Sequence, residues 1–193
     1  QIRKTGNGQL VYALQENQNS ANADNVNTIE IPRGGRHHLI LSDGTGVWLN
    51  SASSLKFPSA FKGKERKVEL TGEAYFEVAH NGRMPFRVVA AGQTGEDIGT
   101  QGNINAYTDE PASKTTLLEG SIKVSISAQS KILKPGQQAS INDSHQLQLI
   151  KEADLEEAVA WKDNVFRFNS EDLGSIMRKI SRWYDVDVEY EDS

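Results

Sequence analysis

Three glutamates on one predicted strand come closest, in residue type and spacing, to a catalytic pair of carboxylates. Glu69, Glu73 and Glu77 lie four positions apart, which on a flat strand separates neighbours by roughly 13 Å, at about 3.3 Å per residue. Glycosidases hold their two carboxyl groups about 5–9.5 Å apart. We therefore interpret this row as the solvated face of a strand, and catalysis would need a partner carboxylate from another strand.

The other residue types that support chemistry are scattered. His37 and His38 are neighbours on a predicted strand and so point to opposite faces, while His80 and His145 stand alone. The sequence contains no HExxH pair, no Gly-x-Ser-x-Gly elbow and no Gly-Lys-Ser/Thr phosphate loop. It therefore predicts no catalytic residue, no cofactor and no metal site, and a protein that is not an enzyme.

The three tryptophans are the other candidates for a small-molecule binding site. Trp48, Trp161 and Trp183 could line a sugar-binding surface. Each falls within an apolar periodic segment, so we predict that each lies in a core.

Composition narrows the class of partner. The 193 residues include 21 Lys and Arg against 26 Asp and Glu, and the formal net charge is −5. This balance argues against nucleic acid and against anionic membrane surfaces, which both need a basic footprint. The absence of cysteine excludes disulfides and thiol chemistry. The sequence also contains no run of about 18 apolar residues, which is the length needed to span a bilayer. Because the chain begins at Gln1, we expect it to be part of a longer protein.

The elements that position these residues change in character along the chain. Residues 1–28 are rich in Asn and Gln and predict a poorly structured lead-in, with one strand around Leu10–Leu14. Residues 29–152 predict an all-β domain: a sandwich, a barrel or a solenoid. Its clearest strand, Val68–Val78, alternates apolar and polar side chains. Further strands are predicted at His38–Leu41, Val47–Leu49, Phe86–Ala90, Asn103–Tyr107, Thr115–Leu118, Ser121–Ile126, Ala139–Ile141 and Leu147–Ile150.

A weak internal repeat accompanies these strands. The pattern Leu-x-Gly at Leu70 and Gly72, continued by alternating apolar residues, recurs 48 positions later at Leu118 and Gly120. Such a repeat suits stacked β-coils, although chance similarity between two half-buried strands explains it equally well.

Residues 153–193 predict a linker helix and a partial β-α-β module. A helix at Ala153–Asp163 is followed by a strand at Val165–Phe168. A second helix, Ser170–Trp183, is capped by Asn169 or Ser170. A strand alternating Val186, Val188 and Tyr190 ends the module. The apolar stripe of the second helix consists of Leu173, Ile176, Met177, Ile180 and Trp183. One helix on two strands buries little surface, so we expect it to pack on the β-domain or on residues beyond Ser193.

An ordered series of short motifs runs from Ile31 to Tyr190. The series comprises Pro32-Arg33-Gly34-Gly35, Leu39-x-Leu41-x-Asp43-Gly44-Thr45-x-Val47-Trp48-Leu49-Asn50-Ser51-x-Ser53, Phe57-Pro58, Arg66-x-Val68-Glu69-Leu70-x-Gly72-Glu73-Ala74-Tyr75-Phe76-Glu77-Val78, Pro85-Phe86-x-Val88, Gly99-Thr100, Asn103-x-Asn105-Ala106-Tyr107, Leu117-Leu118-Glu119-Gly120-Ser121, Leu133-x-Pro135-Gly136-Gln137-Gln138-Ala139, Ala160-Trp161-Lys162, Phe166-x-Phe168, Leu173-x-x-Ile176-Met177 and Arg182-Trp183-Tyr184-Asp185-Val186. It resembles the FecR family of anti-sigma regulators.

The resemblance implies a mainly β fold. It implies a twisted β-solenoid-like domain of many short strands, with a β-sandwich as the alternative, followed by a small partial α/β (β-α-β) module similar to the short N-terminal domain of secretins and TonB-dependent transducers. It also implies a periplasmic region whose parent protein is anchored in the inner membrane by an upstream helix. This region would bind the signalling domain of a TonB-dependent outer-membrane receptor and so control an extracytoplasmic-function sigma factor, which the cytoplasmic region binds. A carbohydrate- or envelope-binding β-domain is the alternative function.

The resemblance also suggests roles for individual residues. The expected partner-binding residues are Phe166, Phe168, Val186, Val188 and Tyr190. The expected structural motif consists of Gly44, Trp48, Gly72, Tyr75, Phe76, Gly120, Gly136, Trp161, Trp183 and Tyr184. Two positions depart from the family pattern. Gly102 stands where an aromatic is expected, which predicts a hole in the packing. Asn164 stands where Gly is usual, and Asn tolerates positive φ.

Overall fold

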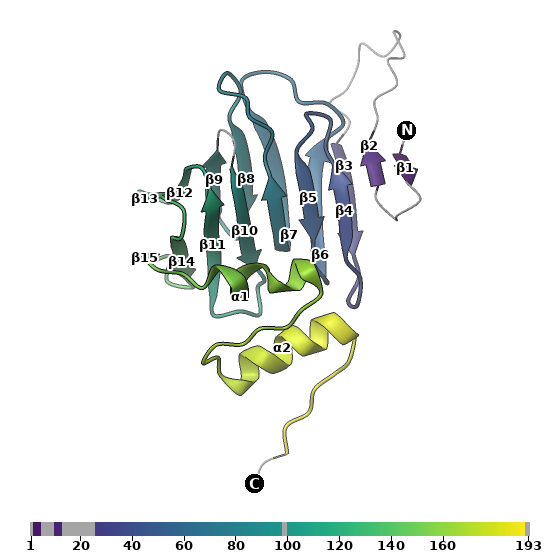
Figure 1. The fold of residues 1–193 in the computed structure, drawn as a ribbon, viewed down its shortest axis with the longest axis vertical. Coiled ribbons are helices and arrows are strands. Elements are labelled where there is room, and N and C mark those ends of the chain that lie inside the picture. Colours follow the sequence, from purple (N-terminus) through teal and green to yellow (C-terminus); the bar gives the residue numbers. More distant parts are fainter. Residues whose placement is uncertain (1, 5–9, 13–25, 98–99, 192–193) are drawn as a thin grey trace.

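The computed structural model describes residues 2–4, 10–12, 26–97 and 100–191, which form a β-domain followed by short helices (Figure 1). The elements are β1 (Ile2–Lys4), β2 (Leu10–Tyr12), β3 (Val26–Ile31), β4 (His37–Ile40), β5 (Gly46–Leu49), β6 (Ser53–Pro58), β7 (Arg66–Glu77), β8 (Phe86–Ala90), β9 (Gln93–Asp97), β10 (Gln101–Ala106), β11 (Ala112–Glu119), β12 (Ile122–Ile126), β13 (Gln129–Leu133), β14 (Gln138–Asn142), β15 (Leu147–Ile150), α1 (Leu155–Val159), the 3-10 helix η1 (Ala160–Asp163) and α2 (Leu173–Tyr184). The prediction of a mainly β chain with a small C-terminal part is confirmed.

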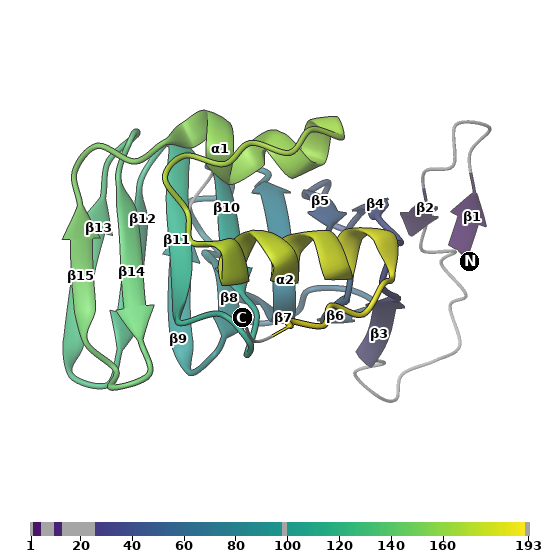
Figure 2. The ribbon, with the colours of Figure 1, turned by 90° about the horizontal axis from the view of Figure 1, so that it is seen from below.

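The strands form two layers that share one strand. Sheet A runs in the order β1-β2-β4-β5-β7-β10-β11-β14-β15, and sheet B joins β3, β6, β7, β8, β9, β12 and β13. Most neighbours are antiparallel, while β2–β4 and β7–β8 are parallel. Seen from below, the two layers face each other, α1 lies along the sheet A side, and α2 crosses the end of the domain (Figure 2).

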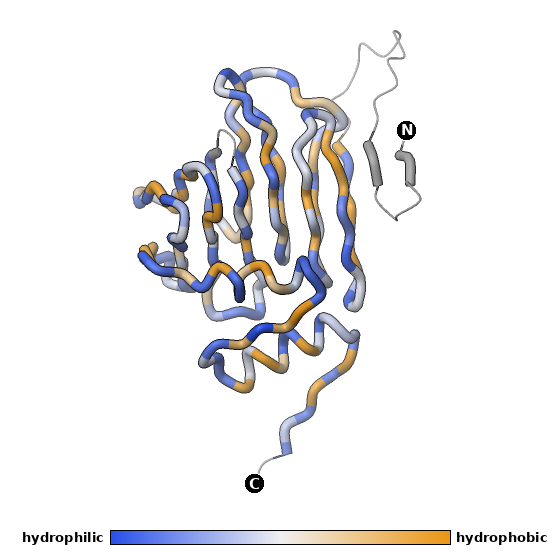
Figure 3. The backbone as a smooth tube through the Cα atoms, viewed as in Figure 1, coloured by the Kyte–Doolittle hydropathy of each residue, from blue (hydrophilic) through white to orange (hydrophobic). Residues whose placement is uncertain are grey.

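The apolar core lies between the two sheets. The larger cluster joins Val47 and Ile104 of sheet A to Leu55 and Phe86 of sheet B, and a second cluster around Leu117 fills the end formed by β11–β15. Apolar and polar segments alternate along the strands of the tube in Figure 3, as expected for strands with one face inward.

Strand β7 passes from one sheet to the other at Gly72. Its first half pairs with β6 and β8 in sheet B, and its second half pairs with β5 and β10 in sheet A. Gly72 has φ +85°, and a Cβ there would lie 2.8 Å from Ser53 Cα, so the crossing requires glycine in both conformation and space.

The crossing overturns half of the alternation predicted for Val68–Val78. Val68, Leu70, Ala74 and Phe76 are buried as predicted, but Glu73, expected on the solvated face, is only 8% exposed. The physical reason is that the outer face of sheet A, unlike that of sheet B, is covered here by the helices.

Both copies of the internal repeat lie where the chain passes from one sheet to the other. Gly120, like Gly72, has positive φ (+90°), and it separates β11 of sheet A from β12 of sheet B. Both copies of Leu-x-Gly therefore stand at a corner between the layers.

Domain edges and the C-terminal module differ from the prediction. Strand β3 begins at Val26, inside the expected lead-in, which also contains β1. Strand β2 covers part of the predicted Leu10–Leu14 strand, and residues 1, 5–9 and 13–25 lie outside the described residues. The predicted strands at 165–168 and 186–190 are not formed, because neither segment has a strand neighbour among the described residues. Val165 N instead donates to Ala160 O.

The predicted helices exist with shifted ends. The first divides into α1 and η1, and the second begins after Asp172, whose carboxylate accepts from Ser175 N; Asn169 and Ser170 do not cap it. Asn164 follows η1 in the left-handed conformation (φ +62°), as its replacement of glycine predicts. Across the described ranges, no helix is long and apolar enough to cross a membrane.

A small apolar cavity of about 20 Å³ adjoins Gly102, with Phe76, Phe86 and Leu117 in its wall. A Cβ on Gly102 would lie 2.9 Å from Thr116 O of β11. An aromatic side chain therefore cannot enter from this position without a shift of the backbone, and the cavity is left unfilled.

Candidate functional site

The described residues form a cavity of about 440 Å³ where the C-terminal helices meet the β-domain. Strands β7, β10 and β11 and the β5–β6 loop supply one wall, and α1, η1, α2 and the 165–172 segment supply the other. We call this junction the seam.

Glu73 lies at the floor of the seam. Its carboxylate accepts hydrogen bonds from Asn50 Nδ2 (2.8 Å) and Asn103 Nδ2 (2.9 Å), and its backbone N–H donates to Ser53 Oγ (2.9 Å). Burial raises the pKa of Glu73, an effect that these two amides oppose. The glutamate row read as a solvated face thus includes one buried, fully hydrogen-bonded carboxyl group.

Asn103 connects this floor to the helices. While its Nδ2 donates to Glu73, its Oδ1 accepts from Trp161 Nε1 (3.2 Å). Trp161, only 8% exposed, therefore fixes η1 on sheet A through the same polar group. This is the one of the three tryptophans for which the predicted core position is correct.

Replacing Glu73 by glutamine is expected to change the pH dependence of stability. Because burial raises the folded-state pKa of Glu73, the stability contributed by its protonated form is complete below the unfolded value of about 4.5 and is lost as pH rises through the folded pKa. Glutamine does not titrate. The free energy of unfolding of Glu73→Gln relative to wild type should therefore increase between about pH 4 and about pH 8, which urea denaturation at both pH values measures. A difference that stays constant with pH contradicts this expectation.

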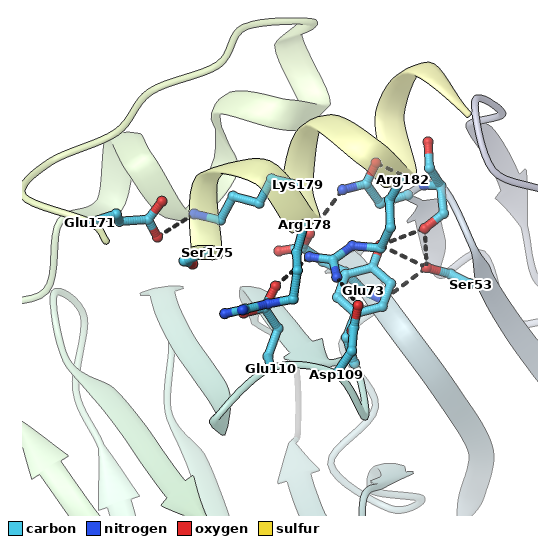
Figure 4. Close-up of polar contacts among 12 residues, drawn as sticks. Ser53, Glu73, Asp109, Glu110, Glu171, Ser175, Arg178, Lys179 and Arg182 are labelled. Atoms are coloured by element: carbon cyan, nitrogen blue, oxygen red, sulfur yellow. Dashed lines mark hydrogen bonds and ion pairs between the residues drawn. The ribbon is translucent and has the colours of Figure 1, made fainter. Parts of the chain in front are cut away.

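Helix α2 is tied to the β10–β11 loop by two arginines (Figure 4). Arg182 pairs with Asp109 (2.7 Å) and with Glu110, and its guanidinium lies 4.0 Å from the ring centroid of Tyr107. Arg178, one turn earlier, reaches the other oxygen of Glu110 (3.0 Å).

The β3–β4 loop holds the end of α2 from the opposite direction. Arg33 donates to Ser181 Oγ (2.6 Å) and Val186 O (2.5 Å), and Gly34 N donates to Arg182 O (2.8 Å). The guanidinium of Arg36 lies 3.7 Å from the Trp183 ring centroid. Two loops of the β-domain thus grip one helix.

Lys179 pairs with two carboxylates, Glu157 and Glu171, at the other end of the seam. Its ammonium contacts Glu171 and lies 3.5 Å from Glu157. Burial raises the pKa of Glu157, and its hydrogen bond with Glu171 raises it further. The charges of the seam are therefore largely satisfied within the chain, as a structural joint requires.

The predicted partner-binding residues lie in the chain segments just before and just after α2. The Phe166 ring packs on Trp183 (centroids 4.5 Å apart) and on Phe168 (5.6 Å). Val186 and Tyr190 are exposed, as is Phe168, while Val188 is half-buried. Tyr184, which belongs to the expected structural motif, is 62% exposed.

Trp48 is not the core residue that the sequence predicts. It is half-buried on the outer face of sheet A, where the His38 ring stacks on it (3.8 Å between centroids). Tyr75, on the opposite neighbouring strand, contacts it at 5.5 Å. The His38 ring therefore covers one face of the indole, and the Lys162 ammonium lies over the ring, 5.3 Å from its centroid. Trp183 is half-buried too, beneath Arg36.

The remaining motif residues have structural positions. Gly44 (φ +88°) and Gly136 (φ +85°) lie in turns, and Phe76 is in the core. The turn at Gly44 sets Asp43 against Arg66, a buried ion pair (2.6 Å) that the sequence did not reveal. The sequence analysis also missed the ion pairs that Arg178 and Arg182 form with the β10–β11 loop. Their spacing of four was the available signal.

The part of the chain that the structure describes brings together no group of three or more His, Asp or Glu side chains able to hold a metal ion.

Comparisons with known proteins agree along the chain. Residues 27–123 match the family described as FecR protein, and residues 165–193 match the one described as FecR, C-terminal. Two crystal structures of a candidate anti-sigma factor from Parabacteroides distasonis ATCC 8503, at 2.50 Å and 1.65 Å resolution, have a similar fold, each with a TM-score of 0.79. The first is 25% identical over 83% of this chain and 76% of its own, and the second 26% identical over 82% and 75%. No curated protein matches the chain.

Proposed function

Because the chain belongs to the FecR family of anti-sigma regulators, we propose that it is the periplasmic, signal-receiving region of such a regulator and binds the signalling domain of a TonB-dependent outer-membrane transducer. The family is one of regulators and not of enzymes, and an anti-sigma factor implies a sigma factor as its partner. In the proposal, an extracytoplasmic-function sigma factor is bound by a cytoplasmic region of the same protein, across the inner membrane.

The observation that carries the proposal is the position of the exposed apolar side chains. Among the described residues, six of the nine large apolar side chains that are exposed lie between residues 165 and 190, the stretch that matches the C-terminal FecR family. They are Val165, Phe168, Leu173, Tyr184, Val186 and Tyr190. Apolar side chains that gather on one part of a surface mark an interaction site.

The local backbone favours a particular mode of binding. Segments 165–168 and 186–190 carry alternating side chains but have no strand neighbours within the part of the chain that the structure describes. An extended segment that belongs to no sheet can pair with an added strand, and alternate side chains then give specificity. We propose that the transducer domain pairs with one of these segments.

Calorimetric titration of the complete periplasmic region with the signalling domain of the transducer encoded beside it tests the proposal. We expect one-to-one binding that Tyr190→Ser weakens by about tenfold, as loss of a buried aromatic at an interface does. The matched control is Ile132→Ser, because Ile132 is similarly exposed (66% against 61% for Tyr190) but lies on β13, outside the C-terminal segment.

Two outcomes would contradict the proposal. One is the absence of binding to the transducer domain, and measurable binding to envelope glycans in its place would point to the carbohydrate-binding alternative. The other is equal weakening by both substitutions, which would place the interface elsewhere.

A further inference from the structure

Helix α2 is attached to the β-domain in an unusual way for an amphipathic helix. Its one buried residue is Arg182. Its apolar stripe stays half-buried at Ile176, Met177 and Ile180, and Leu173 is 64% exposed. A surface helix normally buries its apolar stripe and leaves its charges in water. The attachment of α2 therefore depends on charged side chains.

The β-domain supplies a shaped receptor for those charges. Tyr107 forms its base, with its ring beneath the Arg182 guanidinium and its hydroxyl donating to Ser51 O (2.5 Å). Asp109 and Glu110 form its rim, and the Glu110 side chain is only 8% exposed. We call Tyr107, Asp109 and Glu110 the socket.

The spacing of the two arginines fits the socket. Arg178 and Arg182 are one helical turn apart, so both lie on one face of α2, and they bind the two different oxygens of Glu110. Guanidinium groups suit such sites because their planar donors pair with carboxylates and stack on aromatic rings.

We propose that the socket is a docking site for a helix with arginines four positions apart, and that α2 of this chain occupies it reversibly. A helix of 12 residues is marginal on its own in water, so α2 stays folded only while it is docked. Release from the socket therefore unfolds α2 and leaves the β-domain intact. A partner that binds the 165–190 segment would shift the equilibrium between docked and released α2. This equilibrium exists without any partner.

Hydrogen exchange of the whole chain, without any partner, measures the docking directly. In Arg182→Gln and in Glu110→Gln, we expect the backbone amides of α2 to exchange about tenfold or more faster than in wild type, because each substitution removes the buried ion pair between Arg182 and Glu110. The amides of β5, β7 and β10 should keep their protection. The control is Arg167→Gln, since Arg167 pairs with the exposed Glu156 and lies outside the socket.

The result that overturns the proposal is equally defined. If α2 kept its protection in both variants, the socket would not hold it. If the amides of β5, β7 and β10 lost protection to the same extent as α2, the helix would be an inseparable part of the global fold. Neither outcome involves the transducer, so this test and the binding test fail independently.

Discussion

Asp43→Ala is expected to lower the free energy of unfolding by about 3 kcal/mol, because it leaves the Arg66 guanidinium buried without its counter-charge. Arg66 is 1% exposed, and its Nη1 pairs with Asp43 (2.6 Å). It also donates to Ala79 O and Met84 O, each at 2.8 Å. The carbonyl groups keep the guanidinium in place but do not neutralise it.

Chemical denaturation measures this effect, and a surface pair provides the control. Glu65→Ala removes one of the two carboxylate partners of Arg87, at a site where both side chains are more than a third exposed, so we expect a loss of less than about 1 kcal/mol. The double variant Asp43→Ala with Arg66→Met should regain part of the loss, since no buried charge is left. Equal effects at Asp43 and Glu65 would contradict the assigned role of the buried pair.

Gly72→Ala is expected to cost more than about 3 kcal/mol, as the sum of a conformational and a steric penalty. The residue has φ +85°, and an added Cβ would lie 2.8 Å from Ser53 Cα, a backbone atom that cannot rotate away. Thermal or urea denaturation, read by circular dichroism, reports the loss.

Gly63→Ala separates the two penalties. Gly63 has a similar φ of +93°, but no atom lies within 4 Å of an added Cβ. This control should lose about 1–2 kcal/mol, the cost of the left-handed conformation alone. If the two variants lost the same free energy of unfolding, the close approach of Gly72 to Ser53 would make no contribution to the loss.

Sheet A was easier to predict than sheet B. Strands β5, β10, β11, β14 and β15 follow the predicted segments, whereas β3, β6, β9 and β13 were missed or placed in the lead-in. All four of these belong to sheet B. Strand β9 (QTGED) has few apolar residues, β6 ends in proline, and four of the five residues of β13 are exposed. Such strands are specified by their neighbours more than by their own pattern.

The seam lay beyond sequence reasoning for a similar reason. An alternating strand predicts which side chains share a face, but it does not say whether that face is covered. Glu73 and Glu69 lie on the same predicted face, yet Glu73 is buried under the helices whereas the Glu69 side chain is 44% exposed. The sequence predicted the helix but not the face that it covers, because the carboxylates that Arg182 binds in the β10–β11 loop lie about 70 positions away in the chain.

The shared strand β7 also bears on how quickly the chain folds. It pairs with β5, β6, β8 and β10, so neither sheet can be completed before β7 has crossed between them. Contacts across such distances in sequence are slow to form, and β-rich domains fold in milliseconds to seconds. We therefore expect the corner at Gly72 to form in the rate-limiting step, and the two layers to appear together, in one cooperative transition, when the unfolded chain is diluted from denaturant.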